Sequence, residues 1–454
     1  IVDNATGSWG HINVDHIVQS DRAKVEPPRL LFPNSDFEQG TLEHWTAEGE
    51  AFTIQPTKGD NPKARERQDH ARPQGAYWIG TFERYNGREG EPGAARGDGP
   101  VGTLTSVPFE IRWPYINCLI GSGRLLGQVG VELLIDGQPQ YRATGFNSET
   151  MWPVSFDVAK LMGKMAVIRI FDQATGNWGH VNADNFTGSR QPVSDVVVPN
   201  LDDIREFAMR LRVQGRYLNL PVKNGAEKVI FELRRGEEVV REFDIELGVA
   251  GEPDWWAFYD ISMFRGEDLE LRVREPVLKD VADRLARLVE QSDEIKGAEN
   301  LYHEARRPQF HYTSRRGWNN DPNGLVYYGG EYHLFYQHNP FGIGWGNMHW
   351  GHAVSRDLVH WEELPIALYQ RGLGDMAYSG GGNVDVHNTS GWKTGAEDIL
   401  FVSFTSTGRG ECIAYSDNRG RSFREYEGNP VLKHQGRDPK IIWYDPDHKW
   451  VMIV

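Results

Sequence analysis

The sequence contains few cysteines and no long hydrophobic run. Only two of its 454 residues are cysteine, Cys118 and Cys412, and neither has a second Cys or a His at metal-ligand spacing. A disulfide framework and a zinc site are therefore not predicted. No apolar run approaches the ~18 residues that a membrane-spanning helix needs, so no membrane span is predicted. The chain starts at Ile1 without a signal-like segment, so either a leader has been removed or the chain is a fragment.

Basic residues are also scarce. Lys and Arg number 49 against 64 Asp and Glu, which gives a net charge of −15. Such a surface repels nucleic acid and anionic lipid, so the expected partner is neutral and no nucleic acid is expected. Aromatic residues make up 11% of the chain, with 15 Trp. They either fill the cores of β domains or provide flat faces on which sugar rings stack.

A repeated motif organises the first half of the chain. Asp3–Asp15 reads DNATGSWGHINVD and Asp172–Asp184 reads DQATGNWGHVNAD, with nine of thirteen positions identical at an offset of 169 residues. That spacing is the length of a module rather than of a solenoid repeat. Residues 1–22 are therefore interpreted as the end of a preceding module, and the sequence as a fragment of a tandem-module protein.

Four regions follow from this repeat and from local patterns. After residues 1–22, residues 28–190 form one complete copy, predicted as a β-sandwich from short strand-like segments such as Val129–Ile135 and Met165–Phe171. Residues 200–300 are predicted as an accessory β segment with an amphipathic helix between Pro276 and Lys296. From residue 305 to residue 454 the β pattern resumes, and this region carries the candidate chemistry.

The candidate chemistry begins at Asp321-Pro322-Asn323-Gly324, four residues that each favour a turn. Trp318, Asn319 and Asn320 precede them, and strand-like segments follow. A carboxylate on a rigid turn at a strand end, surrounded by amide and indole groups, suits sugar cleavage. The carboxylate attacks the anomeric carbon, the amides hold hydroxyls and the indoles form an apolar wall.

The region resembles glycoside hydrolase family 32, the invertase, inulinase and levanase group. The resemblance covers about the last 150 residues and rests on motifs in matching order: WNNDPNG at Trp318–Gly324, FYQHNP at Phe335–Pro340, WGNMHWGHAVSRDLVHW at Trp345–Trp361, YSGG at Tyr378–Gly381 and GRDPK at Gly436–Lys440. It implies an all-β chain: jelly-roll-like β-sandwich modules followed by the first blades of a five-bladed β-propeller. Residues 305–454 would be the N-terminal part of that propeller.

The resemblance also implies residue roles. Asp321 would be the nucleophile that forms a covalent fructosyl-enzyme. Asp438 would hydrogen-bond the fructosyl hydroxyls and stabilise the oxocarbenium-like transition state, and Arg437 would keep Asp438 ionised. The remaining substrate-binding candidates, which would line the fructosyl subsite, are Asn320, Gln337, Trp345, Tyr378 and Ser379.

A third carboxyl, the general acid, is needed to protonate the leaving oxygen. Family members carry it in a Glu-Cys pair, and this sequence contains Glu411-Cys412. In the family that pair follows the Arg-Asp-Pro motif, whereas here it precedes Arg437. Glu411 is therefore interpreted as an exposed or substrate-rim residue at the head of a strand. The acid/base Glu is expected beyond Val454, which predicts that the fragment alone is inactive.

The upstream module resembles jelly-roll carbohydrate-binding modules, in which an early Glu and a late Asp often hold a structural calcium. Glu38 and Asp184 are the candidate ligands here, with Asp36 as a third. The alternative is that these residues only cap turns. Three of the module's tryptophans are available for stacking on a sugar: Trp78, Trp113 and Trp152.

Together these features predict a secreted or periplasmic retaining glycoside hydrolase. It would cleave the β-fructofuranosidic bonds of levan, inulin or sucrose, and it would need no cofactor for catalysis. A fructosyltransferase of the same family and a non-catalytic fructan-binding protein remain alternatives, as does a propeller enzyme acting on arabinan or xylan. The Trp318–Gly324 and Arg437–Pro439 motifs favour fructosides over the last of these.

Overall fold

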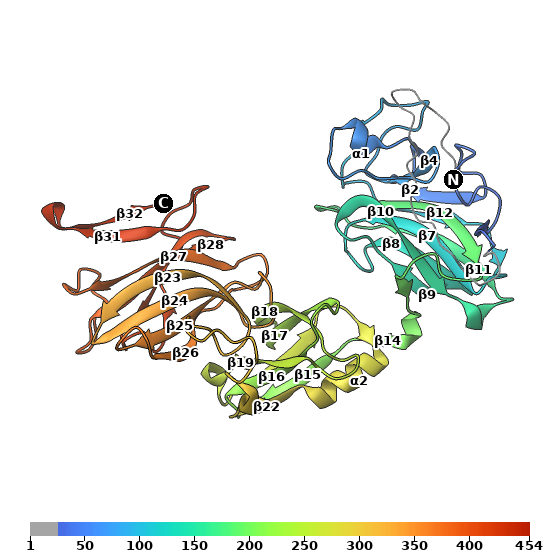
Figure 1. Cartoon of the computed structure of the whole chain (residues 1–454). Helices are drawn as coiled ribbons and strands as arrows, with labels where there is room; N and C mark the ends of the chain where they lie inside the picture. The colour runs from blue at the N-terminus through green and yellow to red at the C-terminus, as the bar shows by residue number, and fades with distance from the viewer. Residues whose placement is uncertain (1–25) are drawn as a thin grey trace, which may run out of the picture. The chain divides into compact units, whose positions relative to one another are not determined.

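The structure is a computed structural model that describes residues 26–454, so the predicted module end at residues 1–22 lies outside the described residues. The chain divides into two compact units with the boundary between Asp203 and Ile204. Strands dominate both units, which confirms the all-β prediction (Figure 1). Both cysteines are buried and free.

The first unit is built from two antiparallel sheets. Within the described residues of this unit, the one parallel pair is that of β13 and β10, at the edge of the seven-stranded sheet. The strands of the seven-stranded sheet are β1 (Arg29–Leu30), β3 (Thr57–Lys58), β4 (Tyr77–Gly80), β7 (Tyr115–Ser122), β10 (Ser148–Asp157), β12 (Val181–Ser189) and β13 (Val197–Val198). Those of the six-stranded sheet are β2 (Trp45–Gly49), β5 (Gly102–Ser106), β6 (Phe109–Glu110), β8 (Val129–Ile135), β9 (Gln138–Ala143) and β11 (Met165–Asp172).

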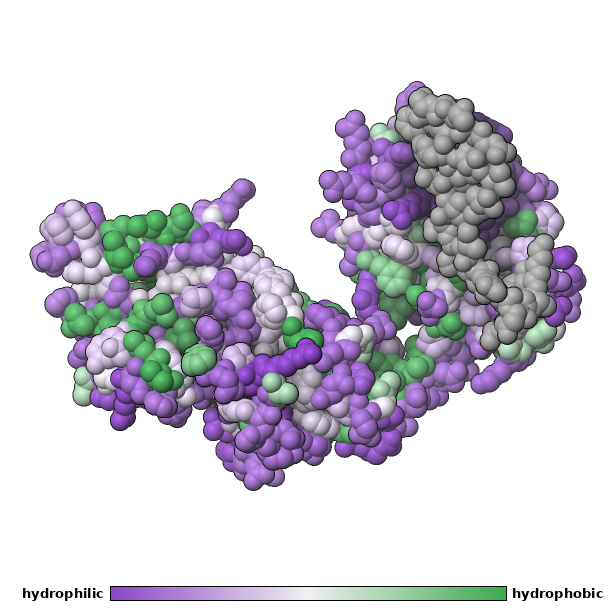
Figure 2. Space-filling view, viewed as in Figure 1, coloured by the Kyte–Doolittle hydropathy of each residue, from purple (hydrophilic) through white to green (hydrophobic). Residues whose placement is uncertain are grey.

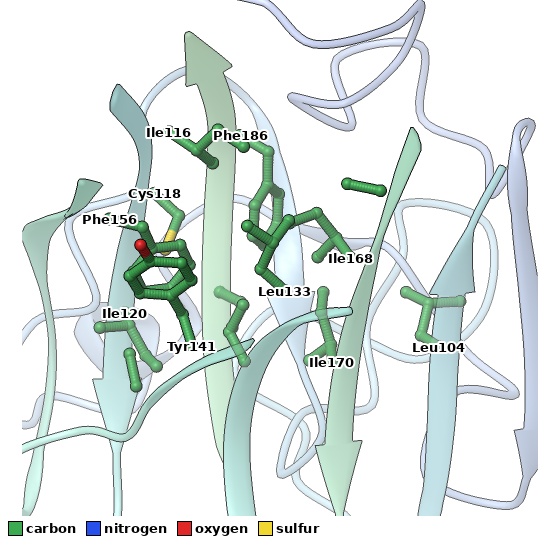
Figure 3. Packing of buried hydrophobic residues seen from close by; sticks show 14 of the residues in the cluster. Leu104, Ile116, Cys118, Ile120, Leu133, Tyr141, Phe156, Ile168, Ile170 and Phe186 are labelled. Carbon is green, nitrogen blue, oxygen red and sulfur yellow. The ribbon is translucent and has the colours of Figure 1, made fainter. Parts of the chain in front are cut away.

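One hydrophobic core joins these two sheets. Alternate residues of each strand point inward, so Ile116, Cys118 and Ile120 of β7 meet residues of β8 and β11 (Figure 3). The opposing side chains are Leu133, Ile168 and Ile170. All six side chains are at most 1% exposed, and burial of this apolar area is the main stabilising contribution in the unit. The predicted strands Val129–Ile135 and Met165–Phe171 are both confirmed.

The short helices of the first unit lie in connections between strands. They are α1 (Asn61–Ala64), η1 (Ala159–Leu161) and η2 (Leu201–Asp203). The Asp60 carboxylate caps α1 by accepting a hydrogen bond from the Lys63 backbone N–H at 3.1 Å, and Pro62 lies in the first turn of the helix.

Residues 204–300 in the second unit form small sheets, one α-helix and two short 3-10 helices around a common core. The sheets contain β14 (Ile204–Arg205) with β21 (Val277–Leu278); β15 (Ala208–Arg212), β20 (Asp268–Val273), β17 (Lys228–Arg235) and β18 (Glu238–Glu246); and β19 (Trp255–Asp260), β16 (Tyr217–Val222) and β22 (Glu290–Ser292). The helices are α2 (Lys279–Leu288), η3 (Ser262–Phe264) and η4 (Ala298–Asn300).

The predicted amphipathic helix is confirmed as α2 but is shorter than the pattern suggested. Ala282 and Leu285 are its fully buried residues, and Leu278 lies just before the helix and is exposed. Val289 is buried as part of an extended segment, because the chain leaves the helix there and enters β22. The hydrophobic spacing continued past the end of the helix and therefore overstated its length.

The last part of the second unit consists of three successive antiparallel sheets. The first contains β23 (Trp318–Tyr328), β24 (Glu331–Asn339), β25 (His349–Ser355) and β26 (Trp361–Leu368). The second contains β27 (Ala377–Asp385), β28 (Ile399–Ser406), β29 (Gly410–Ser416) and β30 (Arg424–Glu425). The third is the hairpin of β31 (Lys440–Tyr444) and β32 (Lys449–Ile453), joined by η5 (Asp445–Asp447).

In each of these three sheets the strands are paired in chain order, and the first strands of the sheets are neighbours in space: β23 contacts β27, and β27 contacts β31 (Figure 1). The contact between β23 and β27 is close enough to require glycine. A Cβ atom on Gly382 would lie 2.9 Å from the Gly324 carbonyl oxygen. Because β23, β27 and β31 are neighbours, the residues at or just before the start of each strand lie close together.

The face shown in Figure 2 is largely hydrophilic, with green hydrophobic areas on the C-terminal part of the chain. Exposed apolar side chains there include Leu325, Val386 and Ile453, which are 59–66% exposed. None of the helices in residues 26–454 is long and apolar enough to cross a membrane.

Candidate active site

A pocket of about 230 Å³ lies where the first strands of the sheets meet. The residues that line it come from motifs spread over more than a hundred positions of the chain: Asn320, Asp321, Gln337, Trp345, Tyr378, Ser379, Arg437 and Asp438. These are the eight catalytic and substrate-binding candidates predicted from the sequence. The fold therefore brings together all of them, and the carboxylates of the pocket lining are those of Asp321 and Asp438.

A second pocket, of about 460 Å³, adjoins the first. Asp321, Ser379 and Asp438 line both, and the strand backbone at Gly324 and Gly382 forms another part of the second pocket. The two carboxylates thus stand at the junction of a small polar pocket and a larger open one. Such an arrangement suits one sugar unit held in the small pocket and a continuing chain or leaving group in the larger one.

Asp321 lies in a β-bulge and not in the predicted turn. Within β23, Asn320 pairs with Gln337 and Pro322 pairs with Tyr336, which leaves Asp321 without a partner on β24. A second irregularity follows between Asn323 and Val326. The turn prediction was wrong because the strand absorbs these residues as bulges, which change the direction of side chains at functional sites. The Asp321 side chain is exposed to the pocket as a result.

Hydrogen bonds fix the surroundings of Asp321. The Ser379 hydroxyl at the start of β27 donates to Asp321 Oδ2 at 3.0 Å. Beside it, Trp318 Nε1 donates to Asn320 Oδ1 at 2.9 Å, which orients the amide of Asn320. Gln337 is buried and donates to the Ala377 carbonyl at 3.0 Å. One carboxylate oxygen of Asp321 therefore has a protein donor, while the other remains available to the pocket.

Two aromatic rings form a wall of the pocket. The rings of Trp345 and Tyr378 meet edge to face, with centroids 6.0 Å apart and an interplanar angle of 72°. Trp345 is 55% exposed, so a large part of its indole faces solvent. Tyr378 is held from behind by the buried Trp350, whose Nε1 donates to the Tyr378 carbonyl at 3.0 Å. This wall can support the apolar face of a sugar.

The loop that carries Trp345 is tied to the accessory β segment. Phe341 stacks on Phe243 of β18, with centroids 3.9 Å apart and planes 8° from parallel. Asn347 donates to the Asp244 carbonyl at 2.9 Å and accepts from the Asp244 N–H at 3.0 Å. Residues 204–300 thus hold the loop that carries Trp345, a role that no local sequence pattern indicated.

Asp438 is held differently from Asp321. It lies in the loop before β31 with a φ of 64°, a left-handed conformation that is uncommon for a residue with a side chain. Its backbone N–H donates to Thr405 Oγ1 at 2.8 Å. Arg437 Nε lies 3.4 Å from Asp438 Oδ2, but both side chains are largely exposed, so this ion pair contributes little to stability.

Glu411 is buried and does not line the pocket, which contradicts the prediction of an exposed or rim position. Its carboxylate lies behind the Asp438 loop, with Thr405 Oγ1 at 2.9 Å and His434 Nε2 at 3.1 Å. Burial raises the pKa of Glu411, and the nearby charge of Asp438 adds to this effect. Sequence spacing had not indicated Thr405 or His434 as part of the site.

The predicted calcium ligands Glu38 and Asp184 both contact the backbone between Gln74 and Tyr77 in the first unit. The Glu38 carboxylate accepts hydrogen bonds from the backbone N–H groups of Ala76 and Tyr77, both at 2.9 Å. Asp184 Oδ2 accepts from the Gln74 N–H at 2.8 Å, while its Oδ1 is buried without a hydrogen-bond partner. Burial, together with the charges of Glu38 and Asp36, raises the pKa of Asp184 far above its usual range.

These groups fit a cation only in part. Within residues 26–454 no group of three or more His, Cys, Asp or Glu side chains is arranged to hold a metal ion. The unpartnered Asp184 oxygen and the acidic surroundings suit a cation, but calcium takes six to eight oxygens. Backbone carbonyls and water would have to complete the set.

The three tryptophans considered for sugar stacking in the first unit differ in accessibility. Trp78 is fully buried and its Nε1 donates to the Gly59 carbonyl at 2.8 Å, so it belongs to the core. Trp113 covers Gly188, where a Cβ atom would lie 2.0 Å from the indole. Trp152 is 49% exposed, which makes it the accessible member of the three.

Comparisons with known proteins agree with the motifs. Residues 311–454 match the glycosyl hydrolases family 32 N-terminal domain, which confirms the resemblance. A levanase of Bacillus subtilis is 52% identical over 162 residues, which are 34% of this chain and 24% of that protein. An invertase of Schizosaccharomyces pombe is 44% identical over 167 residues, which are 34% of this chain and 29% of that protein.

Among solved structures, an exo-inulinase from Aspergillus awamori is 39% identical, covers 33% of this chain and 35% of its own, and has a TM-score of 0.31. The chain spans about a quarter to a third of the length of the curated relatives named above.

Proposed function

Since residues 311–454 match the N-terminal domain of glycosyl hydrolases family 32, we propose that the protein hydrolyses β-fructofuranosidic bonds with retention of configuration. The observation that carries the proposal is the common pocket: eight residues from separate motifs line it, two of them carboxylates. Substrates would be levan, inulin or sucrose. The names of the relatives, a levanase, an invertase and an exo-inulinase, support this substrate class.

In the proposed mechanism, Asp321 attacks the anomeric carbon of the fructosyl unit. The bond from that carbon to the leaving oxygen breaks as the bond to Asp321 forms, and water later hydrolyses the covalent intermediate. The Ser379 hydroxyl, bonded to Asp321 Oδ2, keeps the other oxygen directed at the sugar. Trp345 and Tyr378 supply the apolar wall.

Asp438 accepts hydrogen bonds from fructosyl hydroxyls and stabilises positive charge that develops at the ring in the transition state. Asn320, Gln337 and Arg437 supply the remaining polar contacts of the pocket. The leaving oxygen needs a proton from a third carboxyl. The proposal assigns that role to a Glu beyond Val454 and not to Glu411, whose burial keeps it away from the pocket.

The fold proposal follows from the same region. The two four-stranded sheets and the hairpin of β31 and β32 would be the first blades of a five-bladed propeller. Chain-order pairing within each sheet and the contacts between successive first strands support this proposal. In such a fold, loops at one end of the inner strands converge on a central site.

The first unit is proposed to be a jelly-roll-like carbohydrate-binding module, with a structural calcium near Glu38 and Asp184. Its two sheets around one core and its closing motif support the module assignment. Binding is tested by native electrophoresis of the chain in gels that contain inulin or levan. Retardation that is lost in a Trp152→Ala variant would come from the module, and absence of retardation in every fructan would contradict binding.

The hydrolase proposal is tested by product analysis of the full-length protein with sucrose, inulin and levan. Release of fructose as the main product supports hydrolysis. Predominant transfer of fructosyl units to other sugars would identify a fructosyltransferase instead. Fructan binding without any turnover would identify a non-catalytic binding protein. An extracellular or periplasmic location, expected from polymeric substrates and from extracellular relatives, is tested by fractionating the producing cells.

A further inference from the structure

Glu411 occupies the centre of a hydrogen-bond network behind the Asp438 loop. Thr405 on β28 and Glu411 on β29 are directly paired across the sheet, so their side chains lie on the same face. The Thr405 hydroxyl lies 2.9 Å from Glu411 Oε2, and it accepts the Asp438 N–H at 2.8 Å. A single hydroxyl therefore links the buried carboxylate to the backbone of Asp438.

A second connection runs through His434. The Gly436 N–H donates to His434 Nδ1 at 2.6 Å, so Nδ1 is an acceptor and the neutral ring carries its proton on Nε2. That proton points to Glu411 Oε1, 3.1 Å away. His434 and Thr405 thus both donate to Glu411, one to each carboxylate oxygen.

The backbone of Glu411 is tied to the same loop. Its N–H donates to the Leu432 carbonyl and its carbonyl accepts the Val431 N–H, both at 2.8 Å. Side chain and backbone together hold the segment from Val431 to Asp438 at several points along its length. This support matters because Asp438 adopts a left-handed φ of 64°, a conformation that the surrounding structure must maintain.

We propose that Glu411 is a positioning residue, which acts through Thr405 and His434 to hold the loop that presents Asp438 to the sugar. The inference rests on the proposed function, because it assumes that Asp438 contacts the substrate. Glu411 itself does not take part in bond breaking. Its side chain is fully buried, both oxygens are engaged and it is not part of the pocket lining.

The test compares three variants of the full-length protein. Glu411→Ala removes the acceptor, Glu411→Gln keeps the shape but replaces one acceptor by a donor, and Thr405→Val removes the link to Asp438. Glu363→Gln is the matched control: Glu363 is also a mostly buried carboxylate, which accepts from the Arg315 N–H and side chain, and it lies outside the site. Thermal unfolding of all four verifies that they fold.

Two readouts are needed. Turnover is measured with sucrose and with β-fructofuranosyl fluoride, whose leaving group departs with little proton donation. We expect kcat to fall about a hundredfold in Glu411→Ala and about tenfold in Glu411→Gln and Thr405→Val, equally on both substrates, because the loss of hydrogen bonds displaces Asp438. Hydrogen exchange of the peptide that spans residues 434–438 should accelerate in these variants and remain unchanged in Glu363→Gln.

The outcomes separate the possibilities. A fall on sucrose alone, rescued with the fluoride, would overturn the inference and make Glu411 the proton donor. Unchanged exchange and turnover in Glu411→Ala would also overturn it. If the parent protein hydrolyses neither substrate, the proposed function fails. Faster exchange in the variants would then still show that Glu411 holds the loop, and unchanged exchange would show that it does not.

Discussion

Two aspartates in each compact unit show opposite degrees of exposure. In the second unit, Asp321 and Asp438 are exposed on the lining of the pocket. In the first unit, Asp172 and Asp184 are at most 1% exposed, and each has a carboxylate oxygen without a hydrogen-bond partner. Burial raises the pKa of both, that of Asp172 to about 7.

This difference shows that accessibility and hydrogen bonding decide what a carboxylate can do. An exposed carboxylate retains its charge at low cost and can meet a substrate, whereas a buried one without full partners favours a proton or a cation. Glu411 lies between these cases: it is buried, but Thr405 and His434 both donate to it. A buried carboxylate with such donors can serve as a fixed acceptor.

The largest effect is expected at Asp321. Asp321→Ala should lower turnover of sucrose or inulin at least about a thousandfold, because the proposed mechanism requires its carboxylate as the nucleophile. Thermal unfolding should be unchanged, since the side chain is exposed. Asp417→Ala, at a partly exposed aspartate that pairs with Arg424 and does not line the pocket, is the control. Activity within tenfold of the parent, in a normally folded variant, would remove Asp321 from the nucleophile role.

Asp172 provides the contrasting case, a buried carboxylate that affects stability. Because its folded-state pKa of about 7 exceeds the unfolded value near 3.8, its contribution to stability is fully present below about pH 4. That contribution is lost as pH rises through 7. Asp172→Asn should remove about 2–4 kcal/mol of this pH dependence between pH 4 and 7.

The measurement is denaturant unfolding of parent and variant at several pH values, with the difference attributed to Asp172. The variant should be the more stable protein at pH 8. Equal slopes in the two proteins would mean that Asp172 is ionised in the folded state without cost. That result would weaken the contrast between the two units.

A smaller effect is expected at Asp438. Asp438→Asn keeps the size of the side chain and the backbone hydrogen bond to Thr405, but it removes the charge that stabilises the transition state. Turnover should fall about a hundredfold, with a smaller change in KM. Lys440, which follows in the same motif, can be changed to Met as a control for altered charge near the pocket. A rise in KM alone would assign Asp438 to ground-state binding.

The smallest effect concerns a cation at Asp184. If calcium binds there, chelation should lower the Tm of the first unit by about 5 °C, because a ligand that binds only the folded state stabilises it. Asp184→Asn should abolish this sensitivity to chelator. An unchanged Tm in chelator would show that the buried carboxylate holds a proton instead of a metal ion. Calorimetry of the whole chain, with transitions assigned by the variant, provides the measurement.

Local sequence predicted the bounds of individual strands better than it predicted bulges and side-chain directions within them. Strand Val129–Ile135 follows from its continuous apolar residues and the Asp136–Gly137 turn, and the structure gives the same bounds. Asp321–Gly324 was predicted as a turn because each residue favours one, yet pairing with β24 keeps these residues in a strand with two bulges. Tertiary pairing overrode local turn preference there, and the bulge exposes Asp321.

The sequence by itself determined which residues make the pocket, because the motifs that carry them resemble a known family and retain its order. Only the tertiary structure decided what supports them. Asn347 and Phe341 meet the accessory segment about a hundred residues away, and Glu411 reaches Asp438 through Thr405 and His434. These contacts join residues that are distant in the chain and individually unremarkable, so no local pattern encodes them. They form because packing of the sheets places buried side chains of a strand beside a loop. The polar groups of that loop then form hydrogen bonds with those side chains.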